Sequence, residues 1–196
     1  MSDAELLAAW RDGDGEAGRA LLAGNFDLLC RFFNNKVDND VQDLIQRTML
    51  VCLQHFDRLR EASNFRAYLL AIARNELYRH LSRTRAEGDR IDFGVSSIHD
   101  LSPSPSRVVA EHRDGQLLLE ALRQLPLDEQ VALELFYWED LSYPEIAEIV
   151  DVHRDTVKRR LQRARSRLRE KLAHLGDLPE ERIDEIAQAL RSTTTR

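Results

Sequence analysis

The sequence has no long apolar run, only two cysteines, and little glycine or proline. None of its apolar stretches approaches the roughly 18 residues that cross a bilayer, so we expect no membrane insertion. The acidic start, MSDAELLAAWRDGDGE, lacks the basic and then apolar regions that mark a signal peptide. Cys30 and Cys52 lie in apolar helical patterns, and no Cys/His cluster has the spacing of a metal site. We therefore expect a cytoplasmic protein with reduced thiols, no metal and no cofactor.

Signatures of a catalytic site are lacking as well. The sequence contains no phosphate-binding glycine loop and no nucleophile elbow, so we expect no enzyme activity of its own. What it does contain is a composition of 43% hydrophobic and 32% charged residues, which is typical of a folded helical protein. The alternation of apolar and polar residues that marks strands is missing, which favours an all-α fold.

Helical periodicity fills two stretches of the chain, with a segment between them that lacks it. In the first stretch, VQDLIQRTMLVCLQHF and NFRAYLLAIARNELYRHL each place their apolar residues on one helical stripe. Residues 88–108 are rich in glycine, proline and serine, which is typical of a flexible linker. The pattern predicts two small helical domains, 1–87 and 109–172, and a C-terminal extension, 173–196, with a short amphipathic helix. The extension either packs on the second domain or shields its basic helix.

A helix-turn-helix is predicted within the second domain. Asp128 is a candidate cap for the helix EQVALELFYW. Further on, Ser142 and Glu145 form a capping box that starts the next helix. The short turn DVH then leads into the basic segment, which is the spacing of a helix-turn-helix. Asp151 stands in this turn, where aspartate tolerates the left-handed backbone better than most residues.

The basic segment DTVKRRLQRARSRLREKL holds eight lysines and arginines but two acids, in a chain of net charge −6. Its apolar stripe faces the domain core and consists of Val157, Leu161, Ala164 and Leu168. Another face is placed to read base edges in the major groove, through Lys158, Arg159, Gln162 and Arg163. Phosphate contacts are expected from Arg154, Thr156, Arg160, Arg165 and Arg167. Pairing with acids elsewhere in the chain remains an alternative for the arginines.

Two stretches resemble the bacterial sigma factors of RNA polymerase. The segment LSYPEIAEIVDVHRDTVKRRLQRAR resembles their promoter-recognising C-terminal domain, and DVQDLIQRTMLVCLQHFDRLREASNFRAYLLAIARNELYRHLSR resembles the helices that bind core polymerase and melt promoter DNA. The order and the compact layout resemble the extracytoplasmic-function (ECF) group over residues 4–172. The resemblance implies a specificity subunit that directs promoter-specific initiation, with core polymerase and promoter DNA as partners. An anti-sigma factor or another regulator is left open, and the free chain is expected to be monomeric.

The resemblance also implies contact residues in the first domain. DLIQ is similar to the motif that docks on the beta-prime clamp helices, which assigns docking to Asp43, Leu44 and Gln46. The family usually has an acid at the next position, where this chain has Arg47. The melted minus-ten element is assigned to Tyr68, Asn75, Arg79, Arg74 and Arg66. In the second domain, the resemblance assigns the minus-thirty-five element to the four base-reading residues already named.

Two other functions are compatible with the sequence. An autonomous helix-turn-helix regulator would explain the second domain but would leave DLIQ and FRAYLLAIARN without a purpose. An interaction protein that mimics a sigma factor would bind a regulator or polymerase without supporting transcription.

Overall fold

The computed structural model describes residues 1–55, 64–84, 91–101 and 113–176. Regular structure in these ranges is α-helical, apart from one isolated bridge between Ser97 and Pro126. The chain divides into two compact units, Met1–Thr84 and Arg85–Arg196. The all-α fold with two helical domains is therefore confirmed. None of the helices in the described ranges has both the length and the apolar character that a membrane crossing requires. The predicted amphipathic helix of the extension lies almost wholly in 177–196, outside the described residues.

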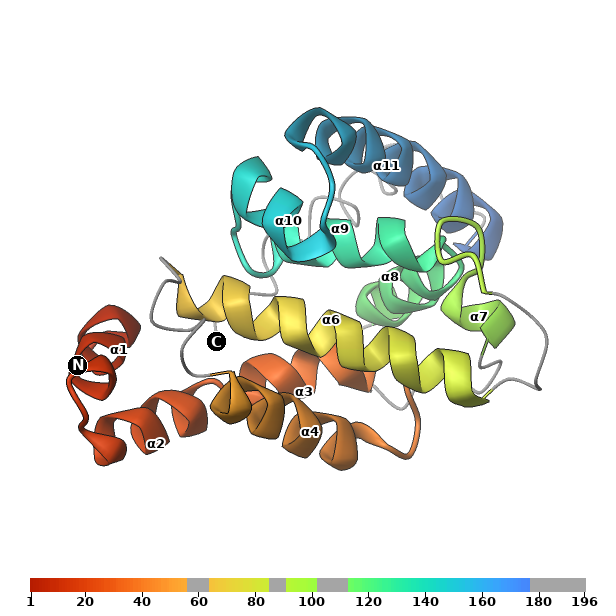
Figure 1. Ribbon diagram of the computed structural model, residues 1–196. Helices are drawn as coiled ribbons and strands as arrows, with labels where there is room; N and C mark the ends of the chain where they lie inside the picture. The colour runs from red at the N-terminus through yellow and green to blue at the C-terminus, as the bar shows by residue number, and fades with distance from the viewer. Residues whose placement is uncertain (56–63, 85–90, 102–112, 177–196) are drawn as a thin grey trace. The chain divides into compact units, whose positions relative to one another are not determined.

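The first unit is built on a pair of long helices, α4 and α6, which pack along each other (Figure 1). Its helices are α1 (Asp3–Arg11), α2 (Gly15–Gly24), α3 (Phe26–Asn34), α4 (Val41–Gln54) and α6 (Phe65–Thr84). Helix α3 contacts both α4 and α6, while α1 packs mainly on α2. This arrangement leaves one side of α4 and one side of α6 at the surface of the unit.

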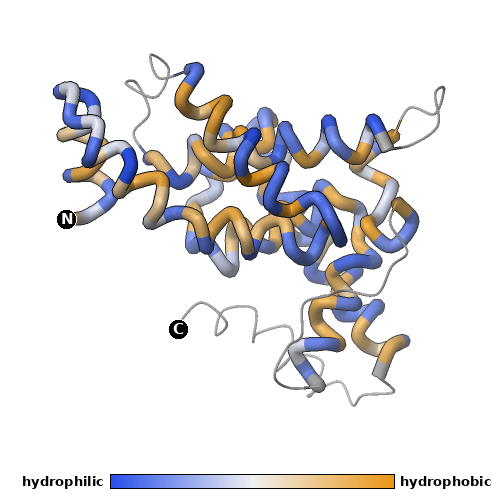
Figure 2. Tube along the Cα trace, turned by 90° about the horizontal axis from the view of Figure 1, so that it is seen from below, coloured by the Kyte–Doolittle hydropathy of each residue, from blue (hydrophilic) through white to orange (hydrophobic). Residues whose placement is uncertain are grey.

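The core of the first unit follows the predicted stripes, which appear as alternating orange and blue segments along the helices in Figure 2. Buried residues of α4 and α6 include Leu44, Ile45, Cys52, Leu69, Ala73 and Leu77. Full burial of a leucine or isoleucine side chain contributes about 1.5–3 kcal/mol relative to exposure. Burial also raises the pKa of the Cys52 thiol to about 12, so this residue stays protonated and packs as a small apolar group.

The N-terminal helices are held together by one close approach. Gly18 of α2 lies under the indole ring of Trp10, where an added Cβ would come within 2.5 Å of a ring carbon. The same indole meets the ring of Phe65 on α6 edge-on, with ring centroids 6.5 Å apart. Trp10 therefore connects α1 and α2 to the rest of the first unit.

The second unit packs its long C-terminal helix against α8, α9 and α10 (Figure 1). Its helices are α7 (Ile98–Leu101), α8 (Arg113–Arg123), α9 (Leu127–Tyr137), α10 (Tyr143–Val150) and α11 (Arg154–Gly176). The apolar stripe predicted for α11 is confirmed, because all four of its residues are at most 1% exposed. The opposite face of α11 consequently points away from this core.

The predicted helix-turn-helix is confirmed in its local details. Ser142 caps α10, and its backbone N–H donates to the Glu145 carboxylate at 2.8 Å in a capping box. Asp151 ends α10 in the left-handed region, at φ 52° and ψ 55°. Helix α11 begins three residues later, at Arg154. The turn therefore has an aspartate at the position where the backbone is left-handed.

Part of the predicted linker belongs to the second unit. Residues 91–101 run beside the start of α9, where the backbone N–H groups of Leu127 and Asp128 donate to the carbonyls of Ser96 and Phe93, each at 3.0 Å. The preceding residue, Pro126, offers no side-chain cap, so carbonyls from this segment satisfy N–H groups that a cap would normally bind. Asp128 lies inside the helix, and the expectation that it caps α9 is therefore wrong.

This segment is fixed by one apolar anchor and one polar turn. Ile98 is fully buried, and the Ser97 hydroxyl donates to the Asp100 carboxylate at 2.6 Å. These hydrogen bonds lower the pKa of Asp100, so the turn is strongest when that carboxylate is ionised. Glycine, proline and serine in this region predict a linker from composition, but they do not reveal that a single isoleucine docks it.

Shortening the anchor tests whether residues 91–101 belong to the second unit. We expect Ile98→Ala to destabilise that unit by about 2–5 kcal/mol, because it removes buried methyl groups from a packed site. Val95→Ala, in the same segment but 73% exposed, is the matched control and should stay within about 0.5 kcal/mol of wild type. Chemical denaturation of both variants measures this. Equal stabilities would contradict a docked segment.

Candidate nucleic-acid interface

The first three turns of α11 present the residues predicted to read DNA bases. Lys158, Arg159 and Gln162 are all exposed, and they share the face opposite the buried stripe. Arg159 makes one long contact along its own helix, from Nε to the carbonyl of Asp155 at 3.4 Å. At the start of α11, His153 Nδ1 accepts the backbone N–H of Asp155 at 3.3 Å and so acts as a weak cap. Among the described residues of the unit, these three side chains are open to solvent.

Arg163 and Arg167 share an acidic partner elsewhere in the chain, which was the open alternative, although the sequence did not identify the residue. Glu129, in the first turn of α9, has a side chain only 4% exposed. Its Oε1 lies 2.9 Å from Nη1 of Arg167 and 3.5 Å from Nε of Arg163. The side chains remain about half exposed, at 45% for Arg167 and 58% for Arg163. They can therefore reach solvent while one buried carboxylate holds their inner sides.

Arg160 occupies a structural position, which disfavours the predicted phosphate contact. Its Nη2 lies 3.1 Å from Oδ2 of Asp128, and the two side chains are 12% and 16% exposed. A guanidinium with so little exposure is committed to its carboxylate, because separating a buried pair leaves a charge without a partner. Arg160 therefore fastens α11 to the start of α9.

Arg165 is also engaged within the unit. Its Nε donates to the Tyr137 hydroxyl at 2.7 Å, and its guanidinium lies over the rings of Phe136 and Tyr137. The remaining predicted phosphate contacts lie at the start of the helix, where Arg154 is exposed and Thr156 is half-buried. Backbone N–H groups at a helix start also attract phosphate, so these two positions suit the predicted role.

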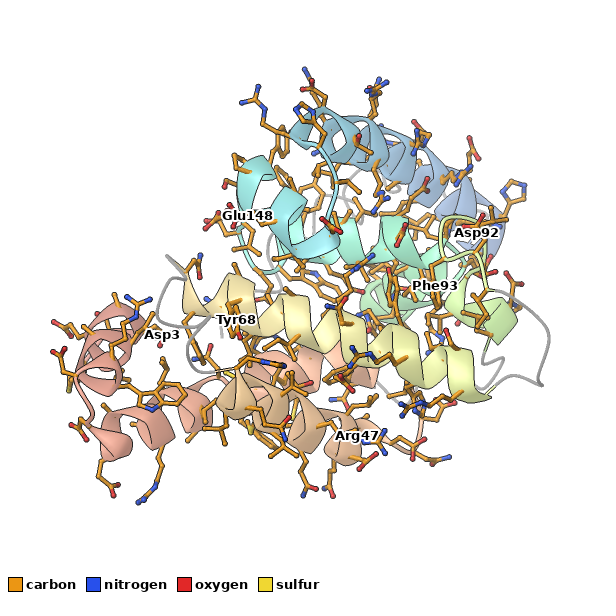
Figure 3. All side chains as sticks on the ribbon, in the orientation of Figure 1. Asp3, Arg47, Tyr68, Asp92, Phe93 and Glu148 are labelled. Carbon is orange, nitrogen blue, oxygen red and sulfur yellow. The ribbon has the colours of Figure 1, made fainter. Side chains whose placement is uncertain are left out.

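A second candidate surface runs along α6 in the first unit, where Figure 3 labels Tyr68. Tyr68 is half-buried and its hydroxyl donates to the carbonyl of His55 at 3.3 Å, which orients the ring. Asn75 is exposed about two helical turns further along the same face. Arg79 follows, with a side chain 63% exposed and an ion pair to Glu76. The surface therefore offers an aromatic ring, an amide and a cation in a row.

Two further predicted residues flank this row. Arg74 lies over the ring of Tyr78, with the guanidinium carbon 4.3 Å from the ring centroid, and it also donates to Asn75 at 3.4 Å. Arg66 is half-buried near the start of α6. The stacked Arg74–Tyr78 pair adds a flat, positively charged element beside the row, and sequence spacing alone did not identify Tyr78 as part of it.

The exposed side of α4 is the third candidate surface, and Figure 3 labels Arg47 on it. Asp43 and Gln46 are exposed, and Asp43 pairs with Arg47 at 2.7 Å. Leu44 is fully buried in the core, so it does not lie on this exposed side and its docking role stays a prediction.

Two leucines on α4 were missed by sequence reasoning. Leu50 and Leu53 are 53% and 49% exposed, although their residue type is usually buried. Both lie off the buried stripe of α4. That position in the sequence was a signal that the two leucines would be exposed. Large exposed apolar side chains beside polar ones are typical of a protein-binding surface.

Family comparisons match both units. The model described as "Sigma-70 region 2" matches residues 26–87, and the one described as "Sigma-70, region 4" matches residues 115–168. The ECF RNA polymerase sigma factor EcfG of Rhodopseudomonas palustris is 32% identical over 126 residues, which cover 64% of this chain and 67% of that protein. This chain belongs to the ECF group of RNA polymerase sigma factors.

Other relatives of this sigma factor agree over a longer span. The ECF RNA polymerase sigma-E factor of Haemophilus influenzae is 25% identical over 194 residues, covering 89% of this chain and 97% of that protein. Among solved structures, the sigma factor RpoE from Bartonella quintana, in complex with the anti-sigma factor NepR, matches with a TM-score of 0.58 and 26% identity. That match covers 81% of this chain and 97% of RpoE.

Membership of the group establishes the role of this sigma factor. It binds core RNA polymerase and directs promoter-specific initiation of transcription. The sigma factor family is a non-catalytic subunit of RNA polymerase. The exposed faces of α11, α6 and α4 are the candidate binding surfaces.

Replacing Arg160 separates a structural arginine from one that binds DNA. We expect Arg160→Met, which keeps most of the aliphatic bulk, to lower the free energy of unfolding by about 2–3 kcal/mol, because it removes an ion pair whose two side chains are mostly buried. That is less than for a fully buried pair, since both side chains retain some exposure. Lys158→Ala should leave the stability unchanged and weaken DNA binding. The assignment is wrong if Arg160→Met keeps full stability and instead reduces the salt dependence of DNA binding.

Proposed function

We propose that the two units read two promoter elements by different physical means. The second unit binds duplex DNA at the minus-thirty-five element through α11. The first unit docks on the polymerase through α4 and holds unpaired bases of the minus-ten element along α6. The observation that carries this proposal is the exposed face of α11, which combines Lys158, Arg159 and Gln162 at the start of a capped helix-turn-helix.

Duplex reading by α11 follows from the chemistry of its outward side chains. Arginine pairs with the O6 and N7 atoms of guanine, and glutamine pairs with the N6 and N7 atoms of adenine. Arg159 and Gln162 are less than one helical turn apart, so they can reach neighbouring base pairs in one groove. Arg154 and Thr156 then bind the flanking phosphates, which fixes the register without selecting a sequence.

Capture of unpaired bases on α6 requires flat surfaces and cations. Base–aromatic stacking contributes about 1–3 kcal/mol per base. Tyr68 supplies a ring that is already oriented by its hydrogen bond, and the Arg74–Tyr78 stack supplies a second flat element. Asn75 offers hydrogen bonds to a base edge, while Arg79 and Arg66 bind the backbone.

Docking on the beta-prime clamp helices is assigned to the exposed side of α4. Asp43 and Gln46 provide polar contacts, and Leu50 and Leu53 provide an apolar contact further along the helix. Arg47 neutralises part of the Asp43 charge, so docking on this chain depends less on its acidic side chain than on the two leucines.

We also propose that the free chain is monomeric and that an anti-sigma factor regulates it. Support comes from the Bartonella quintana neighbour, which was solved with the anti-sigma factor NepR. A regulator that covers the exposed leucines of α4 would exclude the polymerase directly.

Reconstitution with core polymerase and a random promoter library tests the whole proposal. The proposal predicts transcripts that start at defined sites and share an upstream and a downstream element. An autonomous regulator would select DNA without polymerase and yield no new start site. A sigma mimic would bind polymerase and yield no transcript at all.

A single substitution tests base reading. We expect Arg159→Ala to cost about 1–3 kcal/mol in promoter affinity and to relax selection at one upstream base pair. Reselection from the library with the variant measures this. A uniform loss across all sequences would instead identify Arg159 as a phosphate contact.

Another substitution tests docking. We expect Leu53→Glu to weaken binding to core polymerase at least about fivefold, because an interfacial apolar side chain carries about 1–3 kcal/mol. Ala20→Glu adds the same charge at an exposed position of α2 and should bind normally. Equal affinities for the two variants would remove Leu53 from the interface.

A further inference from the structure

The Glu129 carboxylate holds two arginines of the DNA-reading helix unequally. The contact with Arg167 is a hydrogen bond of 2.9 Å, whereas the contact with Arg163 is 3.5 Å, beyond the usual range for this bond. The second carboxylate oxygen, Oε2, is buried and has no hydrogen-bond partner among the described residues. The carboxylate therefore has one firm partner and one loose partner.

The charges explain why both arginines gather there. Arg163 and Arg167 are four residues apart on α11, a spacing at which like charges repel. A single carboxylate between them offsets this repulsion, yet it neutralises only one of the two charges. The remaining positive charge lies at the edge of the face that carries Arg159 and Gln162.

We propose that Glu129 is a positioning residue for promoter reading: it retains Arg167 and releases Arg163 to the DNA. This inference rests on the proposed duplex reading by α11. Arg163 is the residue released because its contact is longer and its side chain is more exposed. Glu129 keeps Arg167 after the release, so no buried charge is left without a partner. The exchange therefore avoids the largest penalty that breaking a buried ion pair would carry.

The fold fixes Glu129 for this role. It is the third residue of α9, where the positive end of the helix dipole favours a carboxylate. The start of this helix is held by the carbonyls of Ser96 and Phe93, and the neighbouring Asp128 anchors Arg160. A carboxylate on so constrained a backbone can orient Arg163 before DNA arrives, which lowers the entropy lost on binding.

Replacing Glu129 with glutamine removes the charge of the side chain but keeps its shape, so it should weaken the positioning of Arg163. With Glu129→Gln, both arginines become available to any phosphate. We expect the full-length chain to bind a random-sequence duplex about threefold or more tighter at low salt, with a log–log salt slope more negative by about 0.9. At the same time, discrimination by the holoenzyme between a library-selected promoter and a competing random template should fall about threefold or more, because Arg163 is no longer held in position.

Three comparisons separate positioning from a merely structural role. Glu129→Asp keeps the charge and should retain the wild-type salt slope. Glu120→Gln removes one charge from α8 of the same unit and should change neither the slope nor the discrimination. In an Arg163→Ala background, Glu129→Gln should no longer alter discrimination, because the two effects pass through the same side chain.

The outcomes are distinct. A Glu129→Gln protein that unfolds at lower temperature but keeps the wild-type slope and discrimination overturns the inference and leaves Glu129 with packing alone. Additive effects of Glu129→Gln and Arg163→Ala also overturn it. If the wild-type holoenzyme itself does not discriminate between the selected promoter and the random template, the proposed function fails instead.

Discussion

Charge balance on α11 is the constraint on which the second unit depends. This helix carries eight lysines and arginines between Asp155 and Leu172, and such a helix repels itself unless some charges are offset. Asp128 and Glu129, adjacent at the start of α9, bind the inner arginines and leave Lys158, Arg159 and Gln162 exposed. Two acids thus divide one basic helix into a side that holds the fold and a side that is available to DNA.

The position of those two acids depends in turn on a segment that precedes α8. Residues 91–101 supply the carbonyls that complete the start of α9, and Ile98 fixes the segment in the core; Figure 3 labels Asp92 and Phe93 in it. The chain that leaves the first unit therefore contributes to the geometry of the reading helix.

Local features of this protein were predictable from sequence, whereas pairings between distant residues were not. The capping box at Ser142, the left-handed turn at Asp151 and the apolar stripe of α11 are each encoded within a few residues, and each was predicted correctly. The Glu129–Arg167 pair joins positions 38 residues apart, so periodicity carries no signal for it. Motif matching does not separate the buried Leu44 from its exposed neighbours, and the same limit hid Leu50 and Leu53.

The most direct test is a structure of the holoenzyme bound to a promoter selected from the random library. We predict that α11 lies in the major groove upstream, with Arg167 still paired to Glu129 and Arg163 on the DNA. We also predict that the exposed side of α4 lies against the clamp and that an unpaired base stacks on Tyr68. A complex in which α11 lies outside the major groove, or in which its exposed face contacts protein alone, would contradict these predictions.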